Sequence, residues 1–163
     1  TGFTNVAYLL GAGFEYDGRA VVTEDLDADG RVDLLVLEFK SGGGAGDQND
    51  QILHVYQNRL MEAGNWVGVR LDQASTHRSP IGATVTVVTA TGSQMTRFVT
   101  GDSFSAQHSA TAHFGLGALT AIDSIEIQWA DGTHQRIENP ALNQYLAIPR
   151  SDDRTTQADE LLR

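Results

Sequence analysis

The chain has 163 residues, of which 40% are hydrophobic and 20% are charged, proportions that suit a soluble globular protein of one or two domains. Its net charge of −10 favours cations as partners and argues against nucleic acid, because phosphate binding needs clustered Lys and Arg. The absence of cysteine excludes disulfides and thiolate metal sites, and no apolar run reaches the length of a transmembrane helix.

The N-terminal part of the sequence predicts four β-strands, at residues 3–10, 19–24, 33–39 and 52–58. The continuous apolar run at 34–37 predicts a strand that is covered on both faces. Residues 40–50 have the Gly-rich composition of a flexible surface loop. The pattern restarts near residues 61–65, so we place a domain boundary there and expect a four-stranded unit over 1–62.

The second part of the sequence alternates apolar and polar residues with the period of two that half-buried antiparallel strands require. Clear examples are WVGVRL at 66–71, ATVTVV at 83–88, SIEIQW at 124–129 and THQRIE at 133–138. TGS at 91–93 and ADG at 130–132 are typical of hairpin turns. We therefore predict an all-β protein whose second domain, residues 63–150, is a sandwich or barrel of about six strands, followed by a frayed polar tail at 151–163.

The segment EDLDADGRVDLLV at residues 24–36 carries the strongest chemical signal. Aspartates at alternate positions of a tight loop can converge on one hard cation, and Gly30 permits the sharp turn that directs a backbone carbonyl inward. Without a cation, so many neighbouring carboxylates would repel one another strongly. We predict a Ca²⁺ site whose ligands are Asp25, Asp27, Asp29, the carbonyl of Arg31, and Asp33.

An EF-hand and a metal-free acidic turn are the alternatives to this site. An EF-hand carries a bidentate glutamate at its twelfth position, but this chain has Val36 there, and both flanks predict strands rather than helices. An acidic turn without metal is conceivable because Asp and Gly are common in turns. A plain turn needs one or two such residues, so the phased aspartates favour a strand–loop–strand calcium site.

Residues 15–60, and above all RAVVTEDLDADGRVDLLVLE, resemble an FG-GAP/VCBS repeat, in which a DxDxDGxxD loop binds calcium between two strands of a propeller blade. The resemblance implies the same five ligands and a blade-like sheet. Residues 65–138 resemble the ASPIC/UnbV domain, through NWVGVRL at 65–71, SPIGATVTV at 79–87, HFGLG at 113–117 and DSIEIQWADG at 123–132. That second resemblance implies an architecture and no enzymatic activity.

No catalytic residues are predicted. The polar segment 103–111 offers Ser and His108 without an obvious partner acid, and no Gly-x-Ser-x-Gly elbow is present. His113 is expected to be structural, because it stands beside the apolar anchors of HFGLG. Trp66 and Trp129 are expected in the core rather than on a sugar-binding surface.

These observations predict a non-enzymatic, calcium-stabilised structural or adhesion module that is secreted or lies at the cell surface. The first residues lack the features of a signal peptide, so the chain is expected to be a mature product or a fragment. The expected partners are further copies of the chain, other extracellular proteins or glycans. Residues 3–10, tethered at one end only, are a candidate for strand exchange that builds oligomers or fibres.

Two other functions are compatible with the sequence. The first is a carbohydrate-binding module of a larger secreted protein, for which Phe104 is the candidate aromatic. The second is an accessory or catalytic enzyme domain, which would need a pocket lined by His108, His113 and a carboxylate.

Overall fold

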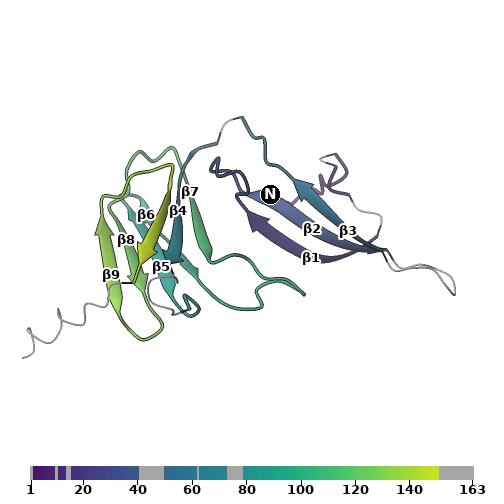
Figure 1. Cartoon of the computed structure of the whole chain (residues 1–163). Coiled ribbons are helices and arrows are strands. Elements are labelled where there is room, and N and C mark those ends of the chain that lie inside the picture. The colour runs from purple at the N-terminus through teal and green to yellow at the C-terminus, as the bar shows by residue number, and fades with distance from the viewer. Residues whose placement is uncertain are drawn as a thin grey trace, which may run out of the picture. The chain divides into compact units, whose positions relative to one another are not determined.

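The computed structural model describes residues 2–9, 11–13, 16–40, 50–61, 63–72 and 79–150 (Figure 1). These residues form ten strands and no helix, so the predicted all-β class is confirmed. The strands are β1 Asp17–Glu24, β2 Asp33–Lys40, β3 Asp50–Tyr56, β4 Asn65–Asp72, β5 Thr84–Thr89, β6 Gly92–Arg97, β7 Thr111–Gly117, β8 Ser124–Gln128, β9 His134–Glu138 and β10 Tyr145–Pro149. Among the same residues, none lies in a helix that would be long and apolar enough to cross a membrane.

The chain divides into two compact units that are not simple consecutive halves. The first unit comprises residues 1–26, 32–58 and 101–108. The second comprises residues 27–31, 59–100 and 109–163. The tip of the loop between β1 and β2 is thus part of the second unit, although the strands that flank it belong to the first.

The first unit is built on an antiparallel sheet with the order β1-β2-β3. Its register places Val22, Leu35 and Val55 side by side on one face, and Val21, Val36 and His54 on the other. A register shift between Gly18 and Ala20 marks an irregularity in β1. Three of the four strands expected in this part of the sequence are therefore present.

The fourth expected strand, at residues 3–10, does not form within the described residues, so a four-stranded sheet was the wrong prediction. Asn5 Oδ1 accepts a hydrogen bond from the Ala7 N–H at 3.0 Å, and Ala12 N donates to the Ala7 carbonyl at 2.8 Å. These local bonds satisfy backbone groups that a strand would have offered to a neighbour. The apolar composition of the segment was a poorer guide to its structure than Asn5.

Coverage of the central strand β2 also differs from the prediction. Val36 is buried, but Leu35 and Leu37 are only half-buried, and their neighbours on the same face, Leu53 and Val55, are exposed. The two faces of β2 are therefore not equally buried, although its sequence is apolar at four consecutive positions. The Gly-rich loop expected at 40–50 lies outside the described residues at positions 41–49, as does the polar tail at 151–163.

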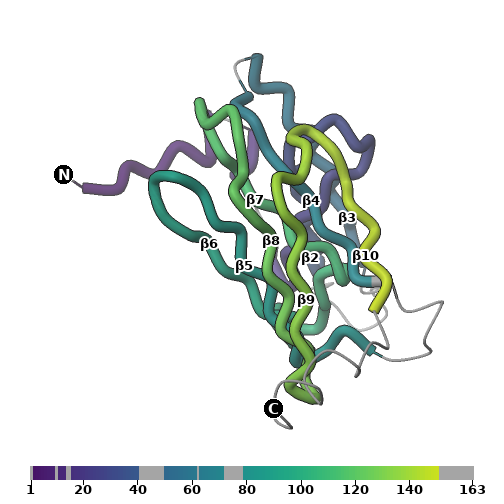
Figure 2. Tube along the Cα trace, turned by 90° about the vertical axis from the view of Figure 1, so that its left-hand side faces the viewer, coloured from purple at the N-terminus to yellow at the C-terminus, as the bar shows by residue number. Residues whose placement is uncertain are grey.

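The second unit contains two sheets, with the orders β10-β4-β7 and β6-β5-β8-β9 (Figure 2). All pairs are antiparallel except β10 with β4, which is parallel. One apolar cluster takes buried side chains from both sheets, which means that the sheets share a single core. Its strand members include Val67, Val69, Phe114 and Leu116 from the first sheet, and Val85, Val87, Ile125 and Ile127 from the second. The described strands form no closed barrel.

The period-two pattern predicted these buried faces well. Val85 and Val87 of β5 are fully buried, whereas Thr84 and Thr86 between them are half-buried. The hairpins expected at TGS and ADG join β5 to β6 and β8 to β9, and Gly132 has a φ of 86° that favours glycine. Trp129 belongs to this core, as expected, whereas Trp66 is buried but is not a member of the cluster.

Candidate metal centre

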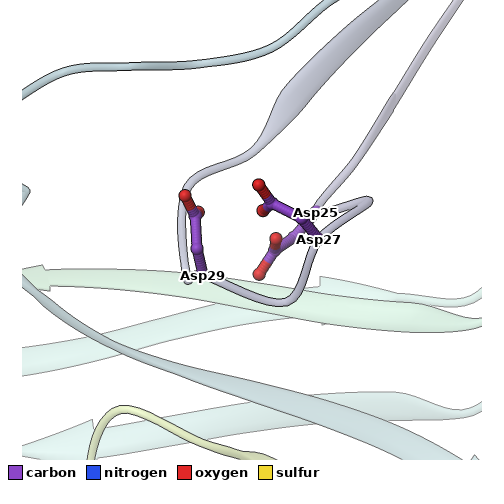
Figure 3. A group of neighbouring side chains, drawn as sticks. All are labelled: Asp25, Asp27 and Asp29. Carbon is purple, nitrogen blue, oxygen red and sulfur yellow. The ribbon is translucent and has the colours of Figure 1, made fainter.

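The loop between β1 and β2 brings three carboxylates together. One ligand oxygen from each of Asp25, Asp27 and Asp29 lies within 4.8 Å of the others. Figure 3 shows the carboxylates of Asp25 and Asp27 directed toward the space that Asp29 bounds on the other side. The Glu24↔Asp33 pair closes the strand ladder at the base of this loop, and the turn therefore starts at Asp25.

The spacing of these oxygens fits a hard divalent cation. Calcium takes oxygen ligands at about 2.3–2.6 Å, so two ligands on opposite sides of the ion lie at most about 5 Å apart. The three oxygens lie within 4.8 Å of one another, so their separations do not exceed this limit. Asp25 is buried, Asp29 half-buried and Asp27 exposed, so the group combines an interior anchor with an open side through which an ion can enter.

Asp33 lies outside this group and bonds to the backbone at the base of the loop. Its Oδ2 accepts the Leu26 N–H at 3.0 Å, and its Oδ1 accepts the Asn58 N–H at 2.7 Å. Only 2% of Asp33 is exposed, so these charge-assisted bonds are shielded from water. Asp33 thus joins the start of the loop to the chain after β3, and because a carboxylate has further lone pairs, its role as a calcium ligand stays a prediction.

Gly30 and Arg31 shape the far side of the loop. Gly30 has a φ of 88°, in agreement with the sharp turn expected there. The Arg31 N–H donates to Asp29 Oδ1 at 2.8 Å, and the Arg31 guanidinium pairs with the other oxygen of the same carboxylate. Asp29 is therefore partly neutralised by a cation from within the loop, while the ligand role of the Arg31 carbonyl stays a prediction.

The segment HFGLG forms most of β7 and is divided between two faces. Phe114 and Leu116 are buried in the core of the second unit, with 2% and 5% exposure. His113 and Gly115 lie on the opposite face, because side chains alternate along a strand. The apolar half of this segment is structural, as expected.

One contact between an acid and a histidine is not evident from the sequence. Asp102 is the acid partner that the polar segment 103–111 was expected to lack, since its Oδ2 lies 3.2 Å from His108 Nδ1. Asp102 also accepts the backbone N–H of His108 at 3.1 Å, and this bond is the main reason that the pKa of Asp102 lies below its usual value. The same carboxylate thus binds both the backbone and the ring of His108, which closes a local loop.

The architecture of the second unit can be compared with known families. The family model described as ASPIC and UnbV matches residues 73–155, just over half of the chain. The chain belongs to the ASPIC and UnbV family. The ASPIC/UnbV match includes all strands from β5 to β10, among them the HFGLG segment of β7.

The ASPIC/UnbV match does not extend to residues 15–60, where the likeness to an FG-GAP/VCBS repeat stays a prediction. No curated protein was found to match the chain. Membership of the ASPIC/UnbV family thus describes the second unit, and the aspartate loop has to be interpreted from its own geometry.

Proposed function

We propose that the loop between β1 and β2 binds calcium, and that the chain serves as a calcium-stabilised structural or adhesion module outside the cell. The observation that carries this proposal is the convergence of the Asp25, Asp27 and Asp29 oxygens within 4.8 Å. The proposed ligands are these three carboxylates, the Arg31 carbonyl and Asp33. An all-oxygen set of this kind suits a hard cation, and the loop lies between the two antiparallel strands β1 and β2.

Calcium is preferred over magnesium on physical grounds. Calcium accepts six to eight oxygens in flexible geometry, whereas magnesium demands a near-ideal octahedron and usually keeps several waters. A loop that offers several carboxylates and a backbone carbonyl is closer to the first case. Extracellular modules bind calcium with Kd values of about 10⁻⁴–10⁻³ M, so a site of modest affinity suffices outside the cell.

The proposed role of the ion is to stabilise the folded chain. Three carboxylates held this close repel one another, and a bound dication removes that repulsion only in the folded state. Stability then rises with calcium concentration by mass action, to about 2.7 kcal/mol at a hundred times Kd. This stabilising role requires no catalytic residue. The contact between Asp102 and His108 is proposed to hold the loop 102–108 closed.

Thermal melting in EDTA and in millimolar calcium tests this proposal. We expect EDTA to lower the melting temperature of the wild-type chain and calcium to restore it. The double variant Asp27→Ala/Asp29→Ala should lose the calcium response. Asp17→Ala/Asp50→Ala is the matched control, because it removes the same two charges from exposed positions at the starts of β1 and β3 and should keep the response. A wild-type melting curve that is identical in EDTA and calcium would contradict the proposal.

We further propose that the chain associates with copies of itself through the first unit. In the described sheet β1-β2-β3, β3 is an outer strand whose edge can accept a further strand, whereas the Val21 carbonyl of the other outer strand, β1, already accepts the Ser103 hydroxyl. The segment at residues 3–10 exposes Phe3, Tyr8 and Leu9. Burial of these side chains against a second copy of the chain would contribute favourable free energy to association. Donation of this segment would require it to leave its local turn and become extended.

Deletion of residues 1–10 tests this association. In millimolar calcium, light scattering after size-exclusion chromatography should show an oligomer for the full chain and a smaller species for the deletion variant. Electron microscopy of the same samples separates closed oligomers from fibres. An unchanged mass after the deletion would contradict strand donation.

Carbohydrate binding is the second candidate function, favoured by one observation. Phe104 is 66% exposed, as an aromatic platform for a sugar ring must be. It stands one residue after Ser103, whose hydroxyl donates to the Val21 carbonyl at 2.7 Å and so ties this segment to β1. Binding on a glycan array in calcium that disappears in Phe104→Ala would favour this function over the structural one.

A further inference from the structure

The tip of the aspartate loop lies against two aromatic rings of the second unit. Gly30 is so close to Trp66 that a Cβ added to Gly30 would lie 1.9 Å from Trp66 Nε1. The carbonyl of Gly30 lies 3.1 Å from His113 Nε2. A carbonyl can only accept, so this ring nitrogen carries the proton and donates it. The loop tip and both rings belong to the second unit.

Two features of β4 and β7 build this aromatic surface, which we name the loop seat and define as Trp66, His113 and Tyr145. Trp66 is opposite Gly115 and His113 is opposite Gly68, so each large ring faces a position without a side chain. The Trp66 and His113 rings are stacked, with 5.2 Å between their centroids and 11° between their planes. The Tyr145 ring packs against Trp66, with 4.8 Å between the two ring centroids.

The residues of the loop seat are closely packed. A Cβ at Gly68 would lie 2.1 Å from the Tyr145 ring, so Tyr145 packs directly over the backbone of β4. The backbone of Trp66 is held on both sides by Asn143, whose N–H donates to the Trp66 carbonyl at 2.7 Å and whose Oδ1 accepts the Trp66 N–H at 3.1 Å. Trp66 is only 8% exposed. These contacts pack Trp66 and Tyr145 closely against the backbone of β4.

We propose that Trp66 and His113 are positioning residues for the metal site: they hold Gly30 in its left-handed conformation and so orient the flanking ligands. Gly30 is directly bonded to Asp29 and Arg31, the two neighbours that the proposed site uses through a carboxylate and a carbonyl. Fixing the Gly30 carbonyl removes rotational freedom that calcium would otherwise have to remove on binding. This inference rests on the proposed calcium site and assigns a function to the histidine of HFGLG.

The coupling must act in both directions, because linkage between two equilibria is reciprocal. If the seat strengthens calcium binding, calcium must strengthen the contact of the loop tip with Trp66. The indole of Trp66 then changes its environment when the ion binds, and its fluorescence reports that change. The chain has only two tryptophans, so each can be observed alone.

Calcium titrations of three variants and one control test the proposal, with calorimetry for Kd. His113→Phe keeps a ring in the stack but loses the donor to Gly30, and we expect its Kd to rise roughly three- to tenfold, as for the loss of one hydrogen bond. The control His134→Ala, at an exposed position of β9, should keep the wild-type Kd.

The fluorescence of single-tryptophan variants tests the contact with the loop tip. Trp129→Phe leaves Trp66 as the only tryptophan. Its emission should change with calcium, and the Kd from this titration should equal the calorimetric Kd. In Trp66→Phe, the core residue Trp129 should show no change.

A glycine pair keeps the proposal testable if His113→Phe does not fold. Gly30 and Gly132 have φ values of 88° and 86°, so alanine strains the backbone equally at both. A Cβ meets Trp66 at Gly30, but nothing lies within 4 Å of a Cβ at Gly132. We expect Gly30→Ala to weaken calcium binding more than tenfold and Gly132→Ala to leave the Kd unchanged.

The outcomes separate the two proposals. If the wild-type chain binds calcium, but His113→Phe or Gly30→Ala keeps its Kd or Trp66 emission ignores the ion, the seat does not position the site and only this inference fails. If the wild-type chain binds no calcium, the proposed function fails and the positioning role fails with it.

Discussion

The two units of this chain are stabilised in different ways. In the second unit, side chains from two sheets form one apolar cluster that includes fully buried Val67, Val85 and Ile125. In the first unit, Leu53 and Val55 of β3 are more than half exposed, and most of the buried polar residues of the described chain, Asp25, Asp33 and Glu38, are found there. The second unit is held by burial of apolar surface, whereas the first depends on polar contacts around a small sheet.

One polar contact of the first unit is centred on a buried acid. Glu38 is almost fully buried and lies 2.8 Å from His54 Nε2, while its other oxygen accepts the Tyr16 N–H at 3.2 Å. Such contacts fix geometry but contribute little net free energy, because each replaces hydrogen bonds to water. The proposed calcium ion would stabilise the folded chain by mass action, because it binds only to the folded state.

The largest expected effect comes from a leucine-to-alanine substitution in each unit, which tests whether the two units depend differently on apolar burial. Leu116→Ala empties a position that is 5% exposed in the second core, and should cost about 2–5 kcal/mol of unfolding free energy. Leu53→Ala removes a side chain that is 59% exposed in the first unit, and should cost about 0.5 kcal/mol or less. Urea unfolding measures both values. Equal losses would show that the two units do not differ in the way described.

The polar contacts of the first unit can be tested separately from the ion. Asp33→Ala removes the carboxylate that accepts the N–H groups of Leu26 and Asn58, and the loss of these two part-buried hydrogen bonds should cost about 0.5–1.5 kcal/mol each. The loss should appear even in EDTA. Asp27→Ala is the comparison: at its exposed position it should cost less than Asp33→Ala in EDTA, and its deficit relative to wild type should grow when calcium is added. If Asp33→Ala were harmless in EDTA, these backbone bonds would not stabilise the first unit.

The sequence predicted the second unit better than the first, for a physical reason. In β5 and β8, the apolar residues at alternate positions, such as Val87 and Ile125, are buried, so the sequence of each strand shows the period of two. In the first unit, residues 3–10 are apolar without such a constraint, and the Asn5 side chain makes a turn where a strand was expected. The Asn5 side chain bonds to a backbone group that a strand would have used, and the amino-acid composition of the segment does not indicate this.

The candidate site was predicted in part. The alternate spacing of Asp25, Asp27 and Asp29 was enough to predict that their carboxylates converge, because it depends only on a few consecutive residues. The contacts of Gly30 with Trp66 and His113 join positions far apart in the sequence, and no local pattern predicts them. The pairing of Asp102 with His108 was not predicted, because the acid lies just outside the polar segment 103–111.

A smaller effect concerns the cation that already lies beside the loop. Arg31 pairs with Asp29 and therefore competes with calcium for that carboxylate. We expect Arg31→Ala to tighten calcium binding roughly two- to fivefold, in keeping with about 0.2–1 kcal/mol for a solvent-accessible ion pair. Arg19→Ala, which removes an equal charge paired with Asp17 on β1, should change the Kd less. Weaker calcium binding in Arg31→Ala would contradict competition.

The smallest expected effect lies in the second unit and depends on pH. Hydrogen bonds from Thr133, first from its backbone N–H, together with the nearby Arg150, lower the pKa of Asp131 from 3.8 to about 2. Because the folded pKa is the lower one, the stabilisation by Asp131 is complete above about pH 4 and disappears as the pH falls through about 2. Asp131→Asn should therefore be slightly less stable than wild type at pH 6 and equally stable near pH 2. A difference that did not shrink toward low pH would contradict this assignment.

Isothermal titration calorimetry of the full chain with calcium tests the central claim most directly. The account predicts one calcium ion bound per chain, with binding lost in Asp27→Ala/Asp29→Ala and retained in Asp17→Ala/Asp50→Ala. A wild-type chain that binds no calcium, or a double loop variant that binds it as well as wild type, would contradict the assignment of the Asp25, Asp27 and Asp29 cluster as a calcium site.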